Sequence, residues 1–273
     1  MTKTVLDYYK GEGDHFRISA SGISRFFTST SSWFRENLTD LDEGFKGSSS
    51  SVLGTIVHYS LECYVRKNPV DLDEINQYLI NQSTIVDDLD VDYIRHQYPI
   101  MARVGQTYLD RELDETCVAE RFVEHTILTG ITVGGSIDLH SGNTVIDYKT
   151  TSAKTIPKNI AYAHKLQLLT YAKLLIDQGH NIKYIRIVYI TTDIVGEISE
   201  KSGKRLKSYP SEVHVLEEPI TKDDLDMIRN IHDVIAQSVA KFRDEPSLRH
   251  ILSQDMRLLN CQTTLKPKDE EEI

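Results

Sequence analysis

The sequence has little cysteine and no long apolar run. Its three cysteines, Cys63, Cys117 and Cys261, are odd in number and far apart, which argues against a disulfide framework and a CxxC metal site. No stretch approaches the ~20 apolar residues of a membrane helix. The polar start MTKTVLDYYKGEGDHF lacks the basic and then apolar segments of a secretory signal. We therefore expect a cytoplasmic protein that does not interact with a membrane.

Positive charge is scarce overall but is concentrated in one region. The formal net charge is -10, whereas phosphate binding usually needs a basic surface. Residues 70–120 contain twelve Asp/Glu against three Arg, but residues 141–210 contain eleven Lys/Arg against five Asp/Glu, a balance of +6. Repulsion from the acidic remainder would confine a nucleic acid to one basic channel.

Hydrophobic periodicity predicts that the first part of the chain is helical. Ser19 and Ser21 are candidate N-caps of a short helix, and a second helix is expected around Ser32–Asn37. Apolar residues recur at helical spacing over Ser51–Arg66, and the acid-rich segment 71–113 predicts further helices.

The period changes after Val118. Three strand-like runs separated by TG and HSGN turns predict an antiparallel meander. The following elements are expected to be a helix over 159–178, a strand over 183–191, a hairpin return to SEVHVLEE, and a Thr-capped helix over 221–242. We therefore expect one mixed α/β (α+β) domain over residues 1–273, with a mostly helical N-terminal lobe (18–115), a core sheet (116–219) and a C-terminal helix and tail (220–273).

Two acids flank the predicted turn between the last two strands of the meander. Asp138 and Asp147 are nine residues apart, so antiparallel pairing would bring both carboxylates to one edge. Two such carboxylates repel unless a cation or a proton lies between them. Mg²⁺ or Mn²⁺ suits such oxygen ligands, and it can activate water and stabilise charge on a phosphate.

Lys149 follows Asp147 by two residues in the stretch VIDYKTT. Residues i and i+2 of a strand point to the same face, so the lysine is expected beside the acid. It could orient or deprotonate an attacking water, or offset charge on the phosphoryl group. A salt bridge on a partly exposed edge strand would use the same two residues.

Four ordered blocks of the sequence, over about 18–191, resemble the RecB-like branch of the PD-(D/E)XK nucleases. The blocks are ISASGISRFF, GTIVHYSLE, GGSIDLHSGNTVIDYKTT and QLLTYAKLL. This branch includes the nuclease domains of RecB and AddB, the CRISPR adaptation nucleases and the mitochondrial genome maintenance exonuclease. The resemblance implies a restriction-endonuclease-like core, in which helices flank a mixed central sheet.

The resemblance also implies roles for individual residues. By this resemblance Lys149 would be the catalytic lysine, and Gln167 and Tyr171, which share a helix face, would help to place the scissile strand or the lysine. The implied metal ligands are His58, Asp138, Asp147, the Tyr148 backbone carbonyl and, on the first core strand, Glu120. An exposed edge glutamate is the equal alternative for Glu120. Outside these blocks, a lone helical histidine or a packed tyrosine would be an ordinary structural feature.

Several residues are candidates for binding DNA. Ser21 and Arg25 belong to the first block, and a basic hairpin could track phosphates or be a solvated turn; its members are Lys201, Lys204, Arg205 and Lys207. An aromatic side chain could stack on an unpaired base, although core packing would equally explain each candidate; these are Phe26, Phe27 and Trp33.

Two motifs are missing. Some relatives bind an iron–sulfur cluster through one cysteine before the histidine helix and three near the C-terminus. Here STSSWF has no cysteine and the C-terminal region has only Cys261, so we expect no cluster. SGKRLKS lacks the first glycine of a Walker A motif, so the chain is not a motor by itself.

The sequence therefore predicts a Mg²⁺- or Mn²⁺-dependent DNA nuclease, most simply a stand-alone exonuclease that acts on single strands or DNA ends in replication, repair or recombination. A helicase, a single-strand-binding protein or a recombination protein would be a partner, in a bacterial or phage-infected cell. The alternatives are a non-catalytic DNA-binding scaffold, an endonuclease or a CRISPR-type end-trimming nuclease. Hydrolysis of a small phosphate ester is less consistent, because no Gly-rich phosphate-binding loop is present.

Overall fold

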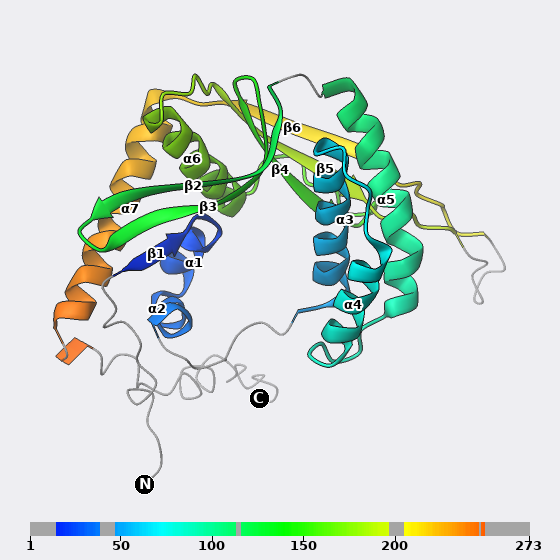
Figure 1. Cartoon of the computed structure of the whole chain (residues 1–273), viewed down its shortest axis with the longest axis horizontal. Coiled ribbons are helices and arrows are strands. Elements are labelled where there is room, and N and C mark those ends of the chain that lie inside the picture. The colour runs from blue at the N-terminus through cyan, green and yellow to red at the C-terminus, as the bar shows by residue number, and fades with distance from the viewer. Residues whose placement is uncertain (1–14, 39–46, 113–115, 197–204, 246, 249–273) are drawn as a thin grey trace, which may run out of the picture.

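A six-stranded mixed sheet organises the chain. The computed structural model describes residues 15–38, 47–112, 116–196, 205–245 and 247–248, and Figure 1 shows their arrangement. The strands are β1 (Phe16–Ser19), β2 (Val118–Leu128), β3 (Ile131–Ser141), β4 (Thr144–Thr151), β5 (Tyr184–Thr191) and β6 (Val213–Pro219). Their order is β1-β3-β4-β5-β6. β1 and β4 pair with the two ends of one edge of β3, and β2 pairs along its other edge.

The expected meander is confirmed. β2, β3 and β4 pair antiparallel in succession. Each turn contains a glycine in the left-handed region, Gly130 at φ 74° and Gly142 at φ 54°, a conformation that other residues adopt at a cost. β5 pairs parallel with β4 and antiparallel with β6, and β1 pairs parallel with β3. The sheet is therefore mixed, as expected.

The predicted helices are also present, with shifted ends. They are α1 (Ile23–Thr28), α2 (Thr30–Leu38), α3 (Ser49–Val65), α4 (Leu72–Ser83), α5 (Val91–Glu112), α6 (Tyr162–Asp177) and α7 (Lys222–Asp244). Thr221 caps α7 as predicted, because its side chain accepts a hydrogen bond from the Asp224 N–H.

At the N-terminal end one strand was missed and one expectation is wrong. Residues 16–19 form β1, which the sequence did not suggest. Ser19 and Ser21 do not cap α1: their hydroxyl oxygens lie 2.9 Å from each other, and Gly22 occupies the N-cap position. The reason is that pairing of β1 with β3 keeps Ser19 extended, and a 3-10 turn (Ala20–Gly22) then leads into α1.

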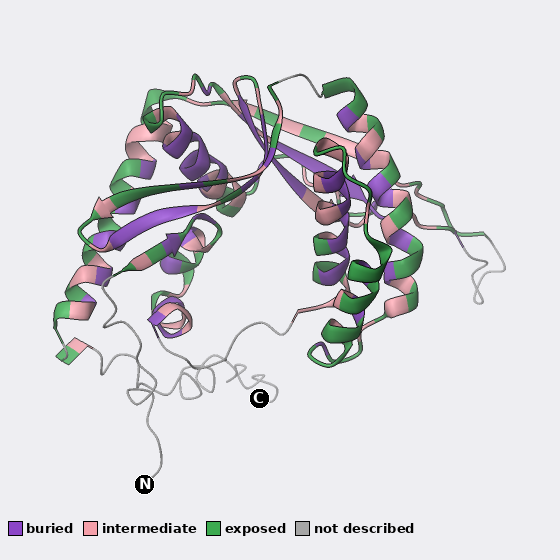
Figure 2. Cartoon of the chain, viewed as in Figure 1, coloured by how far each residue is buried: buried purple, intermediate pink, exposed green. Residues whose placement is uncertain are grey.

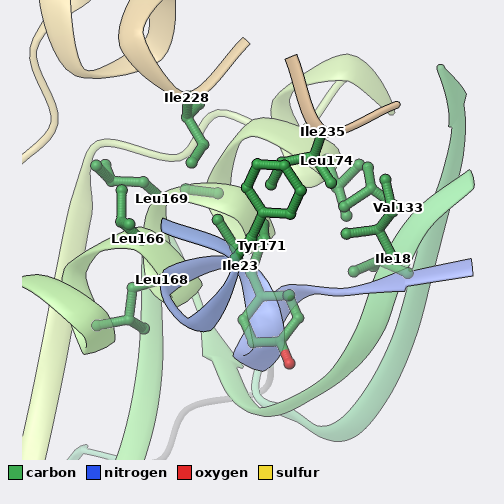
Figure 3. Close-up of a cluster of buried hydrophobic side chains, with 14 of the residues drawn as sticks. Ile18, Ile23, Val133, Leu166, Leu168, Leu169, Tyr171, Leu174, Ile228 and Ile235 are labelled. Carbon is green, nitrogen blue, oxygen red and sulfur yellow. The ribbon is translucent and has the colours of Figure 1, made fainter. Parts of the chain in front are cut away.

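Apolar side chains cover both faces of the sheet. A first cluster joins α1, α6 and α7 to the sheet and includes Val133, Leu169 and Ile235; Figure 3 shows part of it. A second cluster joins α3 and α5 to the opposite face and includes Leu61 and Ile146. Figure 2 shows buried residues along the strands and the sheet-facing sides of the helices. Within the described chain, no helix is long and apolar enough to cross a membrane.

The three aromatic stacking candidates differ in exposure. Phe26 and Trp33 are buried in the first cluster, so core packing accounts for both. Phe27 is 51% exposed, and its ring meets the Phe26 ring edge-on at 5.3 Å.

Candidate active site

The candidate site lies where β3 and β4 separate. The two strands pair only from Leu139–Ile146 to Ser141–Thr144, and Asp138 and Asp147 are the next residues on each strand. On the same edge of β3, β1 pairs with residues 131–134. Among the described strands, none pairs with this edge at 135–138. We call this opening, bounded by Asp138 and Asp147, the fork.

Asp138 is held across the fork by two donors. The Tyr148 N–H donates to Asp138 Oδ2 at 2.8 Å, and His58 Nδ1 lies 3.3 Å from the same oxygen. Burial acts to raise the pKa of Asp138, but its hydrogen bond to His58 and the charges of His58 and Lys149 outweigh burial and lower the pKa. Asp138 is therefore maintained as a carboxylate.

Asp147 and Lys149 form an ion pair on one side of β4. Lys149 Nζ lies 2.7 Å from Asp147 Oδ2 and donates to Oδ1 at 2.9 Å. The Asp147 side chain is only 4% exposed, and its Oδ2 accepts no well-directed hydrogen bond from the described residues. Burial, and then repulsion from Asp138, raises the pKa of Asp147 to about 6, against the effect of Lys149. The two fork carboxylates therefore differ in pKa, which is lowered for Asp138 and raised for Asp147.

Helix α3 brings His58 to the fork because Gly54 lets the helix approach β4. A Cβ atom at Gly54 would lie 3.1 Å from Thr150 Oγ1. Gly54, His58 and Glu62 recur at four-residue spacing and so share a helix face. Burial acts to lower the pKa of His58, but Asp138 outweighs burial and raises it, consistent with an imidazolium–carboxylate pair.

Glu120 lies on β2 at the position that faces Asp138, because Ala119 pairs with Leu139 and Arg121 pairs with Ile137. Its φ is 48°, a left-handed conformation that costs a non-glycine residue about 1–3 kcal/mol. Ser136 Oγ donates to Glu120 Oε2 at 2.6 Å. Burial, and then the charges of Asp138 and Glu62, raises the pKa of Glu120, whereas the Ser136 hydrogen bond opposes this.

A pocket of about 580 Å³ opens over this group. Its walls come from α3, β2 and β4, and its lining residues include Gly54, His58, Glu62, Glu120, Lys149 and Thr150. The two lining residues His58 and Lys149 are the partners of Asp138 and Asp147, so the fork carboxylates are linked to a space that a substrate can enter.

Helix α6 places Tyr171 and Gln167 on the opposite side of the fork. A Cβ atom at Gly135 would lie 2.9 Å from the Tyr171 hydroxyl, so this glycine leaves room for the phenol. Figure 3 shows that hydroxyl pointing out of the apolar cluster. Burial raises the pKa of Tyr171 to about 12, a hydrogen bond from Gln167 lowers it, and the charges of Asp138 and Asp147 raise it. The phenol therefore lies within electrostatic reach of both fork carboxylates.

The donor set suits a hard divalent cation only in part. Two carboxylates and an imidazole meet at the fork, and the buried Asp147 Oδ2 accepts no well-directed hydrogen bond from the described residues, so it is available to a cation. However, among the described residues, no group of three or more His, Cys, Asp and Glu side chains is arranged to hold a metal ion. The reason is visible in the contacts: Asp147 pairs with Lys149, and His58 pairs with Asp138. The backbone places these metal-ligand candidates close together, but in this structure the two carboxylates form ion pairs with His58 and Lys149.

The predicted DNA-binding residues of the first block and of the basic segment, where the structure describes them, contact other parts of the chain. Arg25 forms an ion pair with Glu36 at 2.8 Å. Arg205 Nε donates to the Gly196 carbonyl at 3.1 Å. Lys207 lies over the Tyr209 ring at 4.8 Å. The described chain on both sides of this hairpin projects past α5 in Figure 1. The remaining candidates are Ser21, which contacts Ser19, and Lys201 and Lys204, which lie outside the described residues.

Two residues near Lys149 were missed by the sequence reasoning. Tyr189 is the cross-strand partner of Lys149 on β5, and its buried hydroxyl has no hydrogen-bond partner among the described residues. His164 lies on α6, where burial and then the charge of Lys149 lower its pKa. Tyr189 belongs to an apolar strand and gives no motif; only the parallel register of β4 and β5 reveals its position.

A comparison with protein-family models agrees with the motifs. The sequence matches the model of the PD-(D/E)XK nuclease superfamily over residues 17–259. No curated protein sequence gives a match. Among solved structures, a presumed exonuclease from Eubacterium rectale is 14% identical with a TM-score of 0.49, covering 89% of this chain and 87% of that chain. The alkaline exonuclease LHK-Exo from Laribacter hongkongensis is 9% identical with a TM-score of 0.36, covering 76% and 98%. A phage-related exonuclease from Haemophilus somnus 129PT is 13% identical with a TM-score of 0.33, covering 82% and 96%. These structures are too distant to assign an activity.

Proposed function

The chain belongs to the PD-(D/E)XK nuclease superfamily, and from this premise we propose that it is a metal-dependent DNA nuclease of the RecB-like branch. Its substrates would be single strands or DNA ends, and it would act as a stand-alone exonuclease in replication, repair or recombination. The observation that carries the proposal is the fork: Asp147 pairs with Lys149, and Asp138 pairs with His58, beside one open pocket.

His58, Asp138 and Asp147 would hold Mg²⁺ or Mn²⁺, with the Tyr148 carbonyl and Glu120 as further ligands. When bound, such an ion would lower the pKa of a coordinated water and offset negative charge on the phosphate. The buried Asp147 carboxylate supports this role, because its raised pKa reflects a negative charge that the protein alone solvates poorly.

Lys149 would act on the substrate side. Its side chain is 26% exposed and lines the pocket, so the ammonium can reach both Asp147 and a phosphate in the pocket. It would orient or deprotonate the attacking water, or offset the charge that develops on the phosphoryl oxygens. The contact with Asp147 holds the lysine at the pocket wall.

Gln167 and Tyr171 would position the scissile strand or the lysine. A hydrogen bond from Gln167 to the phenol would hold it near the carboxylates, whose charges affect its pKa, and Gly135 gives the hydroxyl its space. The mainly acidic chain would confine DNA to the basic region that contains Lys149. We further propose that residues 1–273 form one nuclease domain, and that a helicase, a single-strand-binding protein or a recombination protein works with it in the cytoplasm.

The test is cleavage of end-labelled DNA, single- and double-stranded, linear and circular, with Mg²⁺, with Mn²⁺ or with EDTA. We expect metal-dependent release of nucleotides from linear DNA and little cleavage of closed circles. Digestion of circular single strands would indicate an endonuclease instead. Tight DNA binding without cleavage in either metal would contradict the proposal and indicate a scaffold.

A further inference from the structure

Phe122 is an apolar side chain that belongs to neither hydrophobic cluster of the described chain. Among the described phenylalanines, only Phe27 and Phe122 are more than half exposed, Phe122 at 53%. Its neighbour Val123 is 1% exposed and belongs to the first cluster. Because successive strand residues point to opposite faces, Phe122 points to the face of the β2–β3 ribbon that this cluster does not cover.

This uncovered face leads directly to the candidate site. Phe122 pairs across the ribbon with Ser136, and Ser136 donates its hydroxyl hydrogen bond to Glu120, which lines the pocket. Phe122 is two residues along β2 from Glu120, which is about 7 Å in an extended strand. Phe122 is therefore close enough to the pocket for a base near a phosphate bound at Lys149 to reach it.

Arg17 supplies a cation at the same position. Its guanidinium carbon lies 5.2 Å from the centre of the Phe122 ring, within the range of a cation–π contact. Arg17 is exposed on β1, and it forms no ion pair with the residues that the structure describes. The pair therefore presents an aromatic ring and a positive charge with no described carboxylate bound to it.

We propose that Phe122 and Arg17 form a stacking site for an unpaired nucleobase, with Arg17 against the adjoining phosphate. This inference rests on the proposed nuclease function and adds a substrate contact to it. Aromatic rings and arginines beside a phosphate track are how proteins hold single strands without reading their sequence. Phe27, the other exposed phenylalanine, is a weaker candidate because its ring packs edge-on against the buried Phe26.

The test compares a normal single-stranded oligonucleotide with one that carries abasic residues near its cleaved end, in Mg²⁺. Phe122→Ala should lower kcat/KM on the normal strand roughly 5- to 140-fold, the worth of one stacked base, and should leave cleavage of the abasic strand unchanged. Phe122→Trp should retain cleavage of the normal strand. Arg17→Gln should make the salt dependence of binding shallower by about 0.7 in logarithmic slope.

The matched control is Phe27→Ala, which removes an equally exposed phenylalanine and should affect both strands equally. A Phe122→Ala loss of the same size on both strands would show a merely structural role and overturn the stacking site. A base-dependent loss in Phe27→Ala instead would move the site to α1. If Phe122→Ala fails to fold, Phe122→Leu keeps the apolar contact and removes the aromatic face. Failure of the wild type to cleave either strand would refute the nuclease function itself.

Discussion

Replacing Asp147 with asparagine should stabilise the metal-free protein while it removes nuclease activity. The Asp147 side chain is 4% exposed, and burial and Asp138 raise its pKa from 3.8 to about 6. A group with a raised folded-state pKa favours the folded state below its unfolded pKa, and this contribution is lost as the pH rises through the folded value. At about 1.4 kcal/mol per pH unit, ionised Asp147 costs about 3 kcal/mol above pH 6. Asparagine has the same shape and avoids this cost.

The assay is urea unfolding in EDTA at several pH values. At pH 8 the free energy of unfolding of Asp147→Asn should exceed that of the wild type by up to about 3 kcal/mol, and the difference should shrink as the pH falls toward 3.8. Asp177→Asn is the control, because that carboxylate also pairs with a lysine, Lys173, but is 31% exposed; it should give no such gain.

Adding Mn²⁺ should reverse the order of stability. A ligand present at 1,000 times its Kd stabilises the folded state by about 4.1 kcal/mol, which exceeds the expected advantage of Asp147→Asn, and only the wild type keeps both fork carboxylates. If Asp147→Asn is less stable than the wild type in EDTA at pH 8, the carboxylate stabilises the fold and the reasoning is refuted. Equal stabilisation of both proteins by Mn²⁺ would show that the ion binds elsewhere.

Two further substitutions test the geometry of the fork. Gly135→Ala places a Cβ atom 2.9 Å from the Tyr171 hydroxyl, so kcat should fall at least about tenfold. The double variant Gly135→Ala with Tyr171→Phe should recover stability, measured by thermal unfolding, but should not recover activity. Recovery of activity would show that the phenol has no role. Glu120 has φ 48°, so Glu120→Gly should be more stable than Glu120→Ala by about 1 kcal/mol in urea; equal stability would show that the left-handed backbone carries no strain.

Much of the fold follows from local patterns in the sequence. The alternation over 118–151, the two glycine turns and the capped helix after Thr221 depend on residues close in sequence, and each prediction is confirmed. β1 was missed because four residues give too short a pattern, and the strand depends on parallel pairing with β3, far along the chain. The capping prediction for Ser19 and Ser21 failed for the same reason.

Some residues of the candidate site could also be predicted from local sequence, and others could not. The spacing of Asp147 and Lys149 predicts their shared face from strand geometry alone, and the two side chains form an ion pair. By contrast, the neighbours Tyr189 and Phe122 follow only from strand register and from which sheet face is left uncovered. The left-handed backbone of Glu120 has no signal in the sequence either, because glutamate is not a residue that favours this conformation.

Loss of activity in Lys149→Ala, assayed on end-labelled linear single-stranded DNA in Mg²⁺, tests the central claim most directly. The fork and the pocket are the proposed nuclease centre, so the rate should fall about 10²- to 10³-fold, and EDTA should abolish cleavage by the wild type. Lys173→Ala, which removes a lysine paired with Asp177 on α6, should retain activity. Full activity of folded Lys149→Ala would contradict the account.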